Sequence, residues 1–60
     1  MKLMKVSHFG LMLSNKGSEK IELKRGELVL VIKESRYDHA YFLSCRGAGW
    51  GDLRDCDVIN

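Results

Sequence analysis

The chain has 60 residues, of which 45% are hydrophobic and 30% are charged, and its formal net charge is +2. This length allows one domain with a small core, and the balance of apolar and charged residues argues against disorder. No segment approaches the roughly 20 consecutive apolar residues that a membrane-spanning helix needs, and two cysteines are too few for a secreted disulfide scaffold. We therefore expect one cytoplasmic domain over residues 1–60, not bound to a membrane.

The amino-terminal part of the chain is the hardest to assign. Its apolar residues between positions 4 and 13 fit an irregular strand or a poor helix interrupted by Gly10, and we favour the strand. No signal peptide is expected, because His8 interrupts the apolar run and no small-residue cleavage site follows. Residues 15–18 have the composition of a loop.

The run ELVLVI at residues 27–32 is the clearest strand. It is short, rich in aliphatic residues and introduced by Gly26, which lets the chain turn sharply. Just upstream, residues 20–24 alternate between polar and apolar, as a half-buried strand does. The alternation in both segments predicts that four residues face the core: Ile21, Leu23, Val29 and Val31.

A second β-prone run, AYFLSC at residues 40–45, follows the polar segment 34–39. We expect it to pair antiparallel with the first run. The glycine-rich residues 46–49 predict a hairpin connection, after which Trp50 opens a third short strand.

The end of the chain predicts a short helical turn and a closing strand. Residues 53–56 are too few for an α-helix and fit one turn of 3₁₀ helix, with Asp52 placed to cap its exposed amides. Val58 and Ile59 then form the last strand. Short strands at close spacing, with turns between them, are typical of a small barrel or sandwich.

Three stretches, in this order, resemble the Src-homology-3 (SH3-like) barrels, especially their bacterial form. LKRGELVLVI resembles the diverging turn and the strand after it, and AYFLSC with RGAGW resembles the middle hairpin. GWGDLRDCDVI resembles the terminal aromatic, the 3₁₀ turn and the closing strand. The resemblance covers about residues 20–59 and implies an all-β fold: a small five-stranded barrel with a 3₁₀ turn before the last strand.

The sequence departs from the peptide-binding members of that family at the ligand groove. Ala40 stands where they carry a tryptophan, Asp52 where they carry a proline and Asp55 where they carry a tyrosine. A polyproline ligand needs flat aromatic ridges to stack on, so we do not expect proline-rich peptide binding. Gly51 also replaces a usual core residue.

No pattern of catalytic or cofactor chemistry is present. The sequence has no P-loop, dinucleotide fingerprint, zinc-ligand spacing or nucleophile elbow, so no catalytic residue, metal site or cofactor is expected. Two histidines and two cysteines lack the paired spacing of a zinc site: His8, His39, Cys45 and Cys56. We expect both cysteines to be buried, reduced thiols, and His39 to be a solvated loop residue that does not activate Cys45.

Aromatic residues interspersed with arginines form the one candidate site. Aromatic faces can clasp a peptide or stack on bases, and arginine can contact carboxylate or phosphate. Alternation along residues 40–45 predicts Tyr41 and Leu43 inside and Phe42 outside. The alternative that the aromatics are purely structural stays open. The predicted partner-binding residues are Tyr37, Phe42, Arg46 and Trp50.

Three classes of function remain. The leading hypothesis is a non-catalytic protein-binding module, and a free-standing module of this size suits a phage- or plasmid-type accessory protein that acts on a larger host protein. The alternative is a small-barrel nucleic-acid-binding protein, although a net charge of +2 is modest for it. Its phosphate-facing residues would be Lys16, Lys20, Lys24 and Arg25. An enzyme whose site forms only at an oligomer interface is the third class, and no residue specifically supports it.

Overall fold

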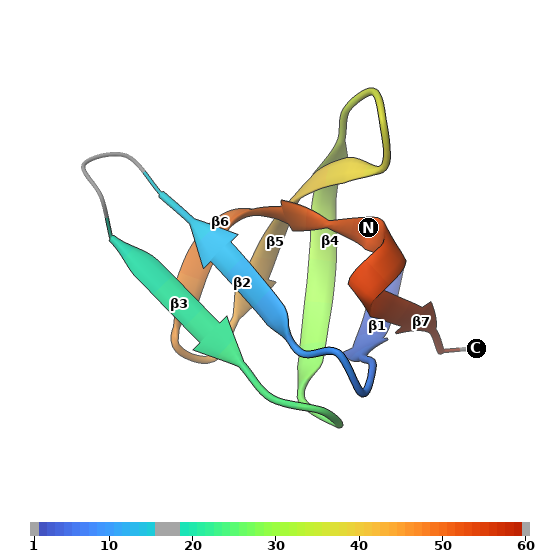
Figure 1. Cartoon of the computed structure of the whole chain (residues 1–60). Coiled ribbons are helices and arrows are strands. Elements are labelled where there is room, and N and C mark those ends of the chain that lie inside the picture. The colour runs from blue at the N-terminus through green and yellow to red at the C-terminus, as the bar shows by residue number, and fades with distance from the viewer. Residues whose placement is uncertain (1, 16–18, 60) are drawn as a thin grey trace.

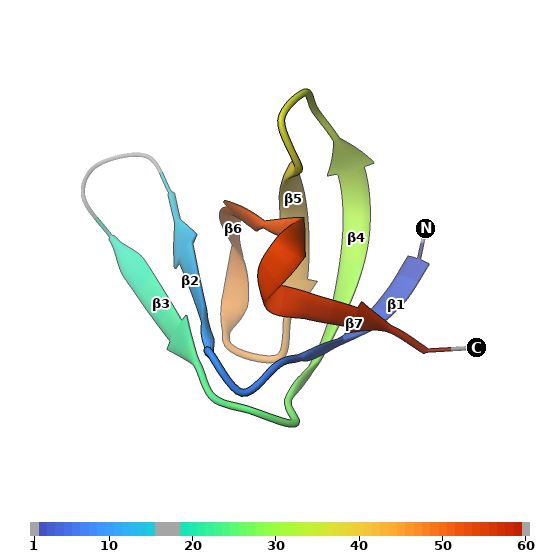
Figure 2. The same ribbon diagram turned by 45° about the vertical axis from the view of Figure 1, so that its right-hand side comes forward.

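The structure, a computed structural model, describes residues 2–15 and 19–59. In this part of the chain, seven antiparallel strands form one sheet that curls into a half-barrel (Figure 1 and Figure 2). The order of strands across the sheet is β3-β2-β6-β5-β4-β1-β7. In chain order the strands are β1 Lys2–Val6, β2 Leu11–Ser14, β3 Lys20–Leu23, β4 Leu28–Glu34, β5 His39–Ser44, β6 Gly47–Asp52 and β7 Cys56–Val58.

The all-β prediction is confirmed, but five strands were too few. One difference lies in the amino-terminal part, where the single strand predicted within residues 4–13 is two strands separated by a turn. Gly10 has a φ of +77°, which favours glycine, and its amide donates to the Ser7 carbonyl at 3.0 Å. Because of this reversal, β1 pairs with β4 and β7, whereas β2 pairs with β3 and β6.

The predictions for the centre of the sheet are confirmed. β4 extends to Glu34, slightly beyond the predicted run, and pairs antiparallel with β5. The turn before β4 contains Gly26 at a φ of +92°, and the Gly26 amide donates to the Val6 carbonyl at 2.9 Å. Three of the four predicted inward residues are buried and the fourth packs against them: Leu23, Val29, Val31 and Ile21 respectively.

Two glycines of β6 explain how so small a chain closes its core. A Cβ on Gly51 would lie 2.9 Å from Leu13 Cδ2, and a Cβ on Gly49 would lie 2.9 Å from the Ser14 carbonyl oxygen. Strand β2 can therefore pack directly on β6, and Leu13, fully buried, fills the space that a larger residue at position 51 would occupy. The buried core consists of Met4, Val6, Leu11, Leu13, Leu23, Val29, Val31, Ala40, Phe42 and Cys56.

The hairpin between β5 and β6 is tighter than predicted, because β6 begins at Gly47 and not at Trp50. The Ser44 side chain stabilises the turn, because its hydroxyl accepts from the Arg46 amide at 3.2 Å and donates to the Gly47 carbonyl at 2.8 Å. Gly47 itself has a φ of +135°. The turn is thus made by Cys45 and Arg46, and the glycines that predicted a loop lie within the strand.

The predicted 3₁₀ turn is confirmed as η2, Leu53–Asp55. The Asp52 carboxylate accepts from the Arg54 amide at 2.9 Å, which is the expected cap. The closing strand begins at Cys56, earlier than predicted, and the Ile59 amide donates to the Leu3 carbonyl at 3.2 Å. Among the described residues, no helix has the length and apolarity required to cross a bilayer.

Candidate binding surfaces

The four residues predicted to bind a partner do not share one face. Phe42 is part of the core, with none of its surface exposed, so its predicted exposure is wrong. The error is one of parity: Ala40 and Phe42 point inward from β5, while Leu43 is 42% exposed. Since a shift of one residue exchanges the two faces of a strand, an apolar run such as AYFLSC leaves its inward side undetermined.

Arg46 lies at the opposite end of the barrel from Tyr37 and has a structural role. Its guanidinium donates to the Glu27 carboxylate at 2.7 Å and to the Glu22 carbonyl at 2.9 Å. Glu27 in turn accepts from the Lys24 amide at 2.6 Å. These contacts join the β5–β6 turn to β3 and to the turn before β4.

Trp50 belongs to an aromatic cluster on the outer side of β5 and β6. Its ring stacks on His39, with centroids 5.1 Å apart and an interplanar angle of 20°, and meets the edge of Tyr41 at 5.3 Å and 68°. Tyr41 is therefore half-buried on the outer side of the sheet. The prediction that it faces the core is wrong. His39 was not identified from the sequence as a member of this cluster. The register pairs His39 with Asp52 and Tyr41 with Trp50, and it depends on the short β5–β6 hairpin.

His39 and Cys45 lie at opposite ends of β5, which for a strand of this length means roughly 17–20 Å. Cys45 is exposed, contrary to prediction, whereas Cys56 is buried as predicted. Burial, followed by the charges of Asp55 and Asp57, raises the pKa of the Cys56 thiol to about 11. In the part of the chain that the structure covers, no three metal-ligating side chains gather.

The β4–β5 hairpin carries Tyr37 at its tip. Tyr37 and the next residue, Asp38, both have positive φ, 61° and 60°. The His39 amide donates to the Arg36 carbonyl at 3.3 Å, and the Ser35 amide donates to the His39 carbonyl at 2.8 Å. Two consecutive left-handed residues between paired strands are a type I′ turn, which strongly prefers Asn-Gly.

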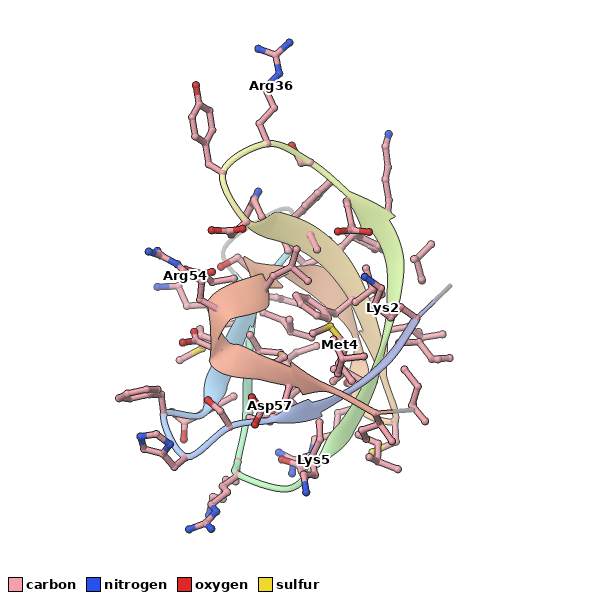
Figure 3. The ribbon with its side chains drawn as sticks, turned by 90° about the vertical axis from the view of Figure 1, so that its right-hand side faces the viewer. Lys2, Met4, Lys5, Arg36, Arg54 and Asp57 are labelled. Atoms are coloured by element: carbon pink, nitrogen blue, oxygen red, sulfur yellow. The ribbon has the colours of Figure 1, made fainter. Side chains whose placement is uncertain are left out.

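The tip of this hairpin stands clear of the barrel. Figure 3 shows Arg36 at the end of the hairpin, with its side chain extending away from the strands. Tyr37 is 91% exposed, so its ring has almost no packing partner in the domain. A left-handed conformation costs an ordinary residue about 1–2 kcal/mol, and aspartate less than tyrosine. The domain therefore holds an unpacked tyrosine in an unfavourable backbone conformation.

A second surface is apolar and lies on the outer side of β1, β4 and β5. Leu3 pairs with Leu30, and Leu30 pairs with Leu43, so the three side chains form one row across the strands. With Leu28 they line a hollow of about 290 Å³ that also touches Ser44 and Cys45 and has no charged residue in its lining. We call Leu3, Leu28, Leu30 and Leu43 the leucine face.

A third surface is a hollow of about 450 Å³ between the β1–β2 turn and the end of β3. On one side the largely exposed Phe9 packs against His8, with ring centroids 3.9 Å apart, and on the other lie Lys24 and Arg25. Glu22 and Asp55 also line it.

The basic residues predicted for nucleic acid are only partly brought together. Lys24 and Arg25 line the same hollow. Lys20 begins β3 and pairs with Ser14, so it lies at the other end of that strand. Lys16 lies outside the described residues.

Comparison with known proteins identifies no relative: no protein-family model, no curated protein and no solved structure matches this chain.

Proposed function

We propose that this chain is an SH3-like, non-catalytic protein-binding module that recognises its partner with the tip of the β4–β5 hairpin. The order of elements supports the fold assignment, because a central three-stranded meander is followed by a 3₁₀ turn and a short closing strand. The aromatic cluster of His39, Tyr41 and Trp50 extends the binding surface from the hairpin down the outer side of β5 and β6.

The observation that carries the proposal is the conformation of Tyr37. A positive φ is rare for a bulky residue such as tyrosine. Tyr37 has a positive φ and is also 91% exposed. Neither packing nor turn geometry favours tyrosine at this position. Backbone strain tends to be kept at recognition and catalytic sites, where the strained side chain has a task outside the fold.

The neighbouring residues indicate what kind of partner fits. Arg36 precedes Tyr37, and tyrosine and arginine are enriched among the residues that dominate binding energy. A protruding hairpin complements a concave surface. We therefore expect a protein with a cleft that receives the Tyr37 ring and offers a carboxylate to the Arg36 guanidinium.

Two variants of the turn test the proposal in opposite ways. Tyr37→Asn removes the ring and relieves the backbone, whereas Asp38→Gly relieves the backbone and keeps the ring. Each purified, tagged protein is incubated with lysate of the source cells, and the captured proteins are quantified by mass spectrometry. We expect Tyr37→Asn to lose the protein that wild type enriches, with affinity reduced roughly 30-fold or more, and Asp38→Gly to retain it.

Arg36→Ala serves as a second test of the same element, and Phe9→Ala, at the far hollow, as a control for an exposed aromatic. If Tyr37→Asn and Arg36→Ala both capture the wild-type partner undiminished, the hairpin is not the binding element.

The hollow beside Phe9 favours a second function, the binding of single-stranded nucleic acid. An exposed aromatic ring can stack on a base while Lys24 and Arg25 contact phosphates. Glu22 and Asp55 in the same lining oppose this, which is why we rank it below protein binding.

Fluorescence anisotropy with a labelled single-stranded oligonucleotide distinguishes the two functions. Two phosphate contacts predict that the logarithm of the binding constant falls with the logarithm of salt concentration with a slope of about −1.4. Arg25→Ala should halve that slope. No binding at low salt would eliminate this second function without affecting the first.

A further inference from the structure

The leucine face is formed by other residues than the hairpin. We propose that it is the interface of a symmetric homodimer, in which the leucine face of one copy packs against the leucine face of a second copy of this chain.

The geometry of the sheet makes this face continuous. Val29, Val31 and Phe42 point into the core, so the residues between them on β4 and β5 point outward. Leu30 is the centre of a cross-strand row with Leu3 on one side and Leu43 on the other. Leu28, two residues before Leu30 on β4 and on the same side of the strand, is 56% exposed. Leu3 and Leu43 are 39% and 42% exposed, and Leu30 between them is half-buried.

The composition of the face favours a second copy over an unrelated partner. The centres of homodimer interfaces are more apolar than those of transient complexes and are depleted in charge. The lining of this hollow consists of aliphatic side chains, Ser44 and Cys45. It contains no aromatic or arginine residue, so burial of aliphatic side chains would supply most of the binding energy.

The charges at the rim also fit a second copy. Lys5 and Asp57 are cross-strand partners on β1 and β7, beside Leu28, and Figure 3 shows both at the lower end of the strands. A two-fold axis presents the same surface in reverse order. The lysine of each copy can then face the aspartate of the other, whereas a partner with a strongly charged surface of one sign would meet one like charge.

A stable dimer must bury a sizeable share of the surface of so small a domain. A standard interface buries about 800 Å² on each partner, which is about a fifth of the 4356 Å² surface of this domain. Packed sheets lie about 10 Å apart with their side chains interdigitated, so the interface that we propose extends beyond the leucine face to the exposed Lys5 and Ile32 on either side of it. Domains of this size often gain stability by self-association.

Sedimentation equilibrium of the full chain measures the association, with a matched pair of variants. Leu43 and Met12 are 42% and 45% exposed, both in strands, but Met12 lies on β2 outside the leucine face. Leu43→Lys buries an unpaired charge in the dimer and should weaken it roughly 100-fold or more. Met12→Lys should leave the dimer intact, and so should Tyr37→Asn. Thermal melting checks that each variant is folded.

The labelling rate of the Cys45 thiol gives a second measurement of association, which can be made on the wild-type chain. It touches the leucine hollow and is exposed in the single chain, whereas Cys56 is buried with a pKa of about 11 and is poorly reactive. The rate at which a thiol reagent labels Cys45 should fall as wild-type concentration rises through the dissociation constant. In Leu43→Lys the rate should not change with concentration over the same range.

Three results would overturn the inference: a monomeric wild type at the highest soluble concentration, a Leu43→Lys variant that dimerises as wild type does, or a Cys45 labelling rate that is independent of wild-type concentration. None of these results bears on the hairpin, because the two surfaces are formed by different residues.

Discussion

The strain in the β4–β5 turn can be measured directly as an increase in stability when the turn is given its preferred residues. Tyr37 and Asp38 both adopt positive φ, 61° and 60°, and this conformation costs about 1–2 kcal/mol for an ordinary residue and less for aspartate. Because Tyr37 is 91% exposed, replacing its ring forfeits almost no packing. We therefore expect Tyr37→Asn to stabilise the domain by about 1 kcal/mol.

Asp38→Gly should give a smaller gain, because glycine also has more freedom to lose on folding, about 0.5–1 kcal/mol. For a domain of this size, 1 kcal/mol raises Tm by about 4–8 °C, which differential scanning calorimetry resolves. Tyr37→Phe, which keeps the bulk and the backbone preference, is the control and should melt as wild type does. If both Tyr37→Asn and Asp38→Gly melt at or below the wild-type temperature, the turn is not strained and the main support for the hairpin proposal is lost.

Three further predictions concern contacts that hold the barrel together. Arg46→Ala should destabilise it by about 1 kcal/mol in urea denaturation, because the ion pair to Glu27 and one backbone hydrogen bond are lost; an unchanged midpoint would mean that these contacts contribute nothing. Gly51→Ala should cost about 1–3 kcal/mol through overpacking against β2, seen as a lower Tm, and a neutral result would show that β2 can move away. Hydrogen bonds from Arg54 hold the pKa of Asp52 below its usual value. The ionised Asp52 therefore stabilises the folded domain at pH values above the pKa of an unperturbed aspartate, and this stabilisation is lost as pH falls through the lowered pKa of the folded state. Asp52→Asn keeps the cap but should remove that part of the acid dependence of Tm, and an unaltered acid profile would count against the pair.

The features that could be predicted from sequence are those set by neighbouring residues. The turn at Gly26, the alternation that leads into β4 and the 3₁₀ turn capped by Asp52 each depend on a few adjacent positions. Composition and short strands were likewise enough to predict an all-β domain. The separation of β1 from β2 was missed because a strand, a poor helix and two strands joined at Gly10 share much the same local pattern.

The candidate site was predicted less well, because it depends on which side of a strand each residue faces. Both sides of β5 are apolar or aromatic, so alternation alone could not decide between Phe42 and Tyr41 for the core. Phe42 and Ala40 are the cross-strand partners of Gly49 and Gly51, which contact β2, and they lie on the same inward side of the sheet. Tyr37 was identified from its type and its place in a polar segment, but its positive φ depends on the length of the hairpin.

NMR can locate the residues of this domain that contact its protein partner. Amide shifts of the isotope-labelled domain are followed while the protein captured by wild type and lost by Tyr37→Asn is titrated in. We expect the largest changes on residues 35–39, continuing to Tyr41 and Trp50, while the amides around Phe9 and Arg25 stay unchanged. Changes confined to Phe9, Lys24 and Arg25, with the hairpin unaffected, would show that the partner does not bind the hairpin.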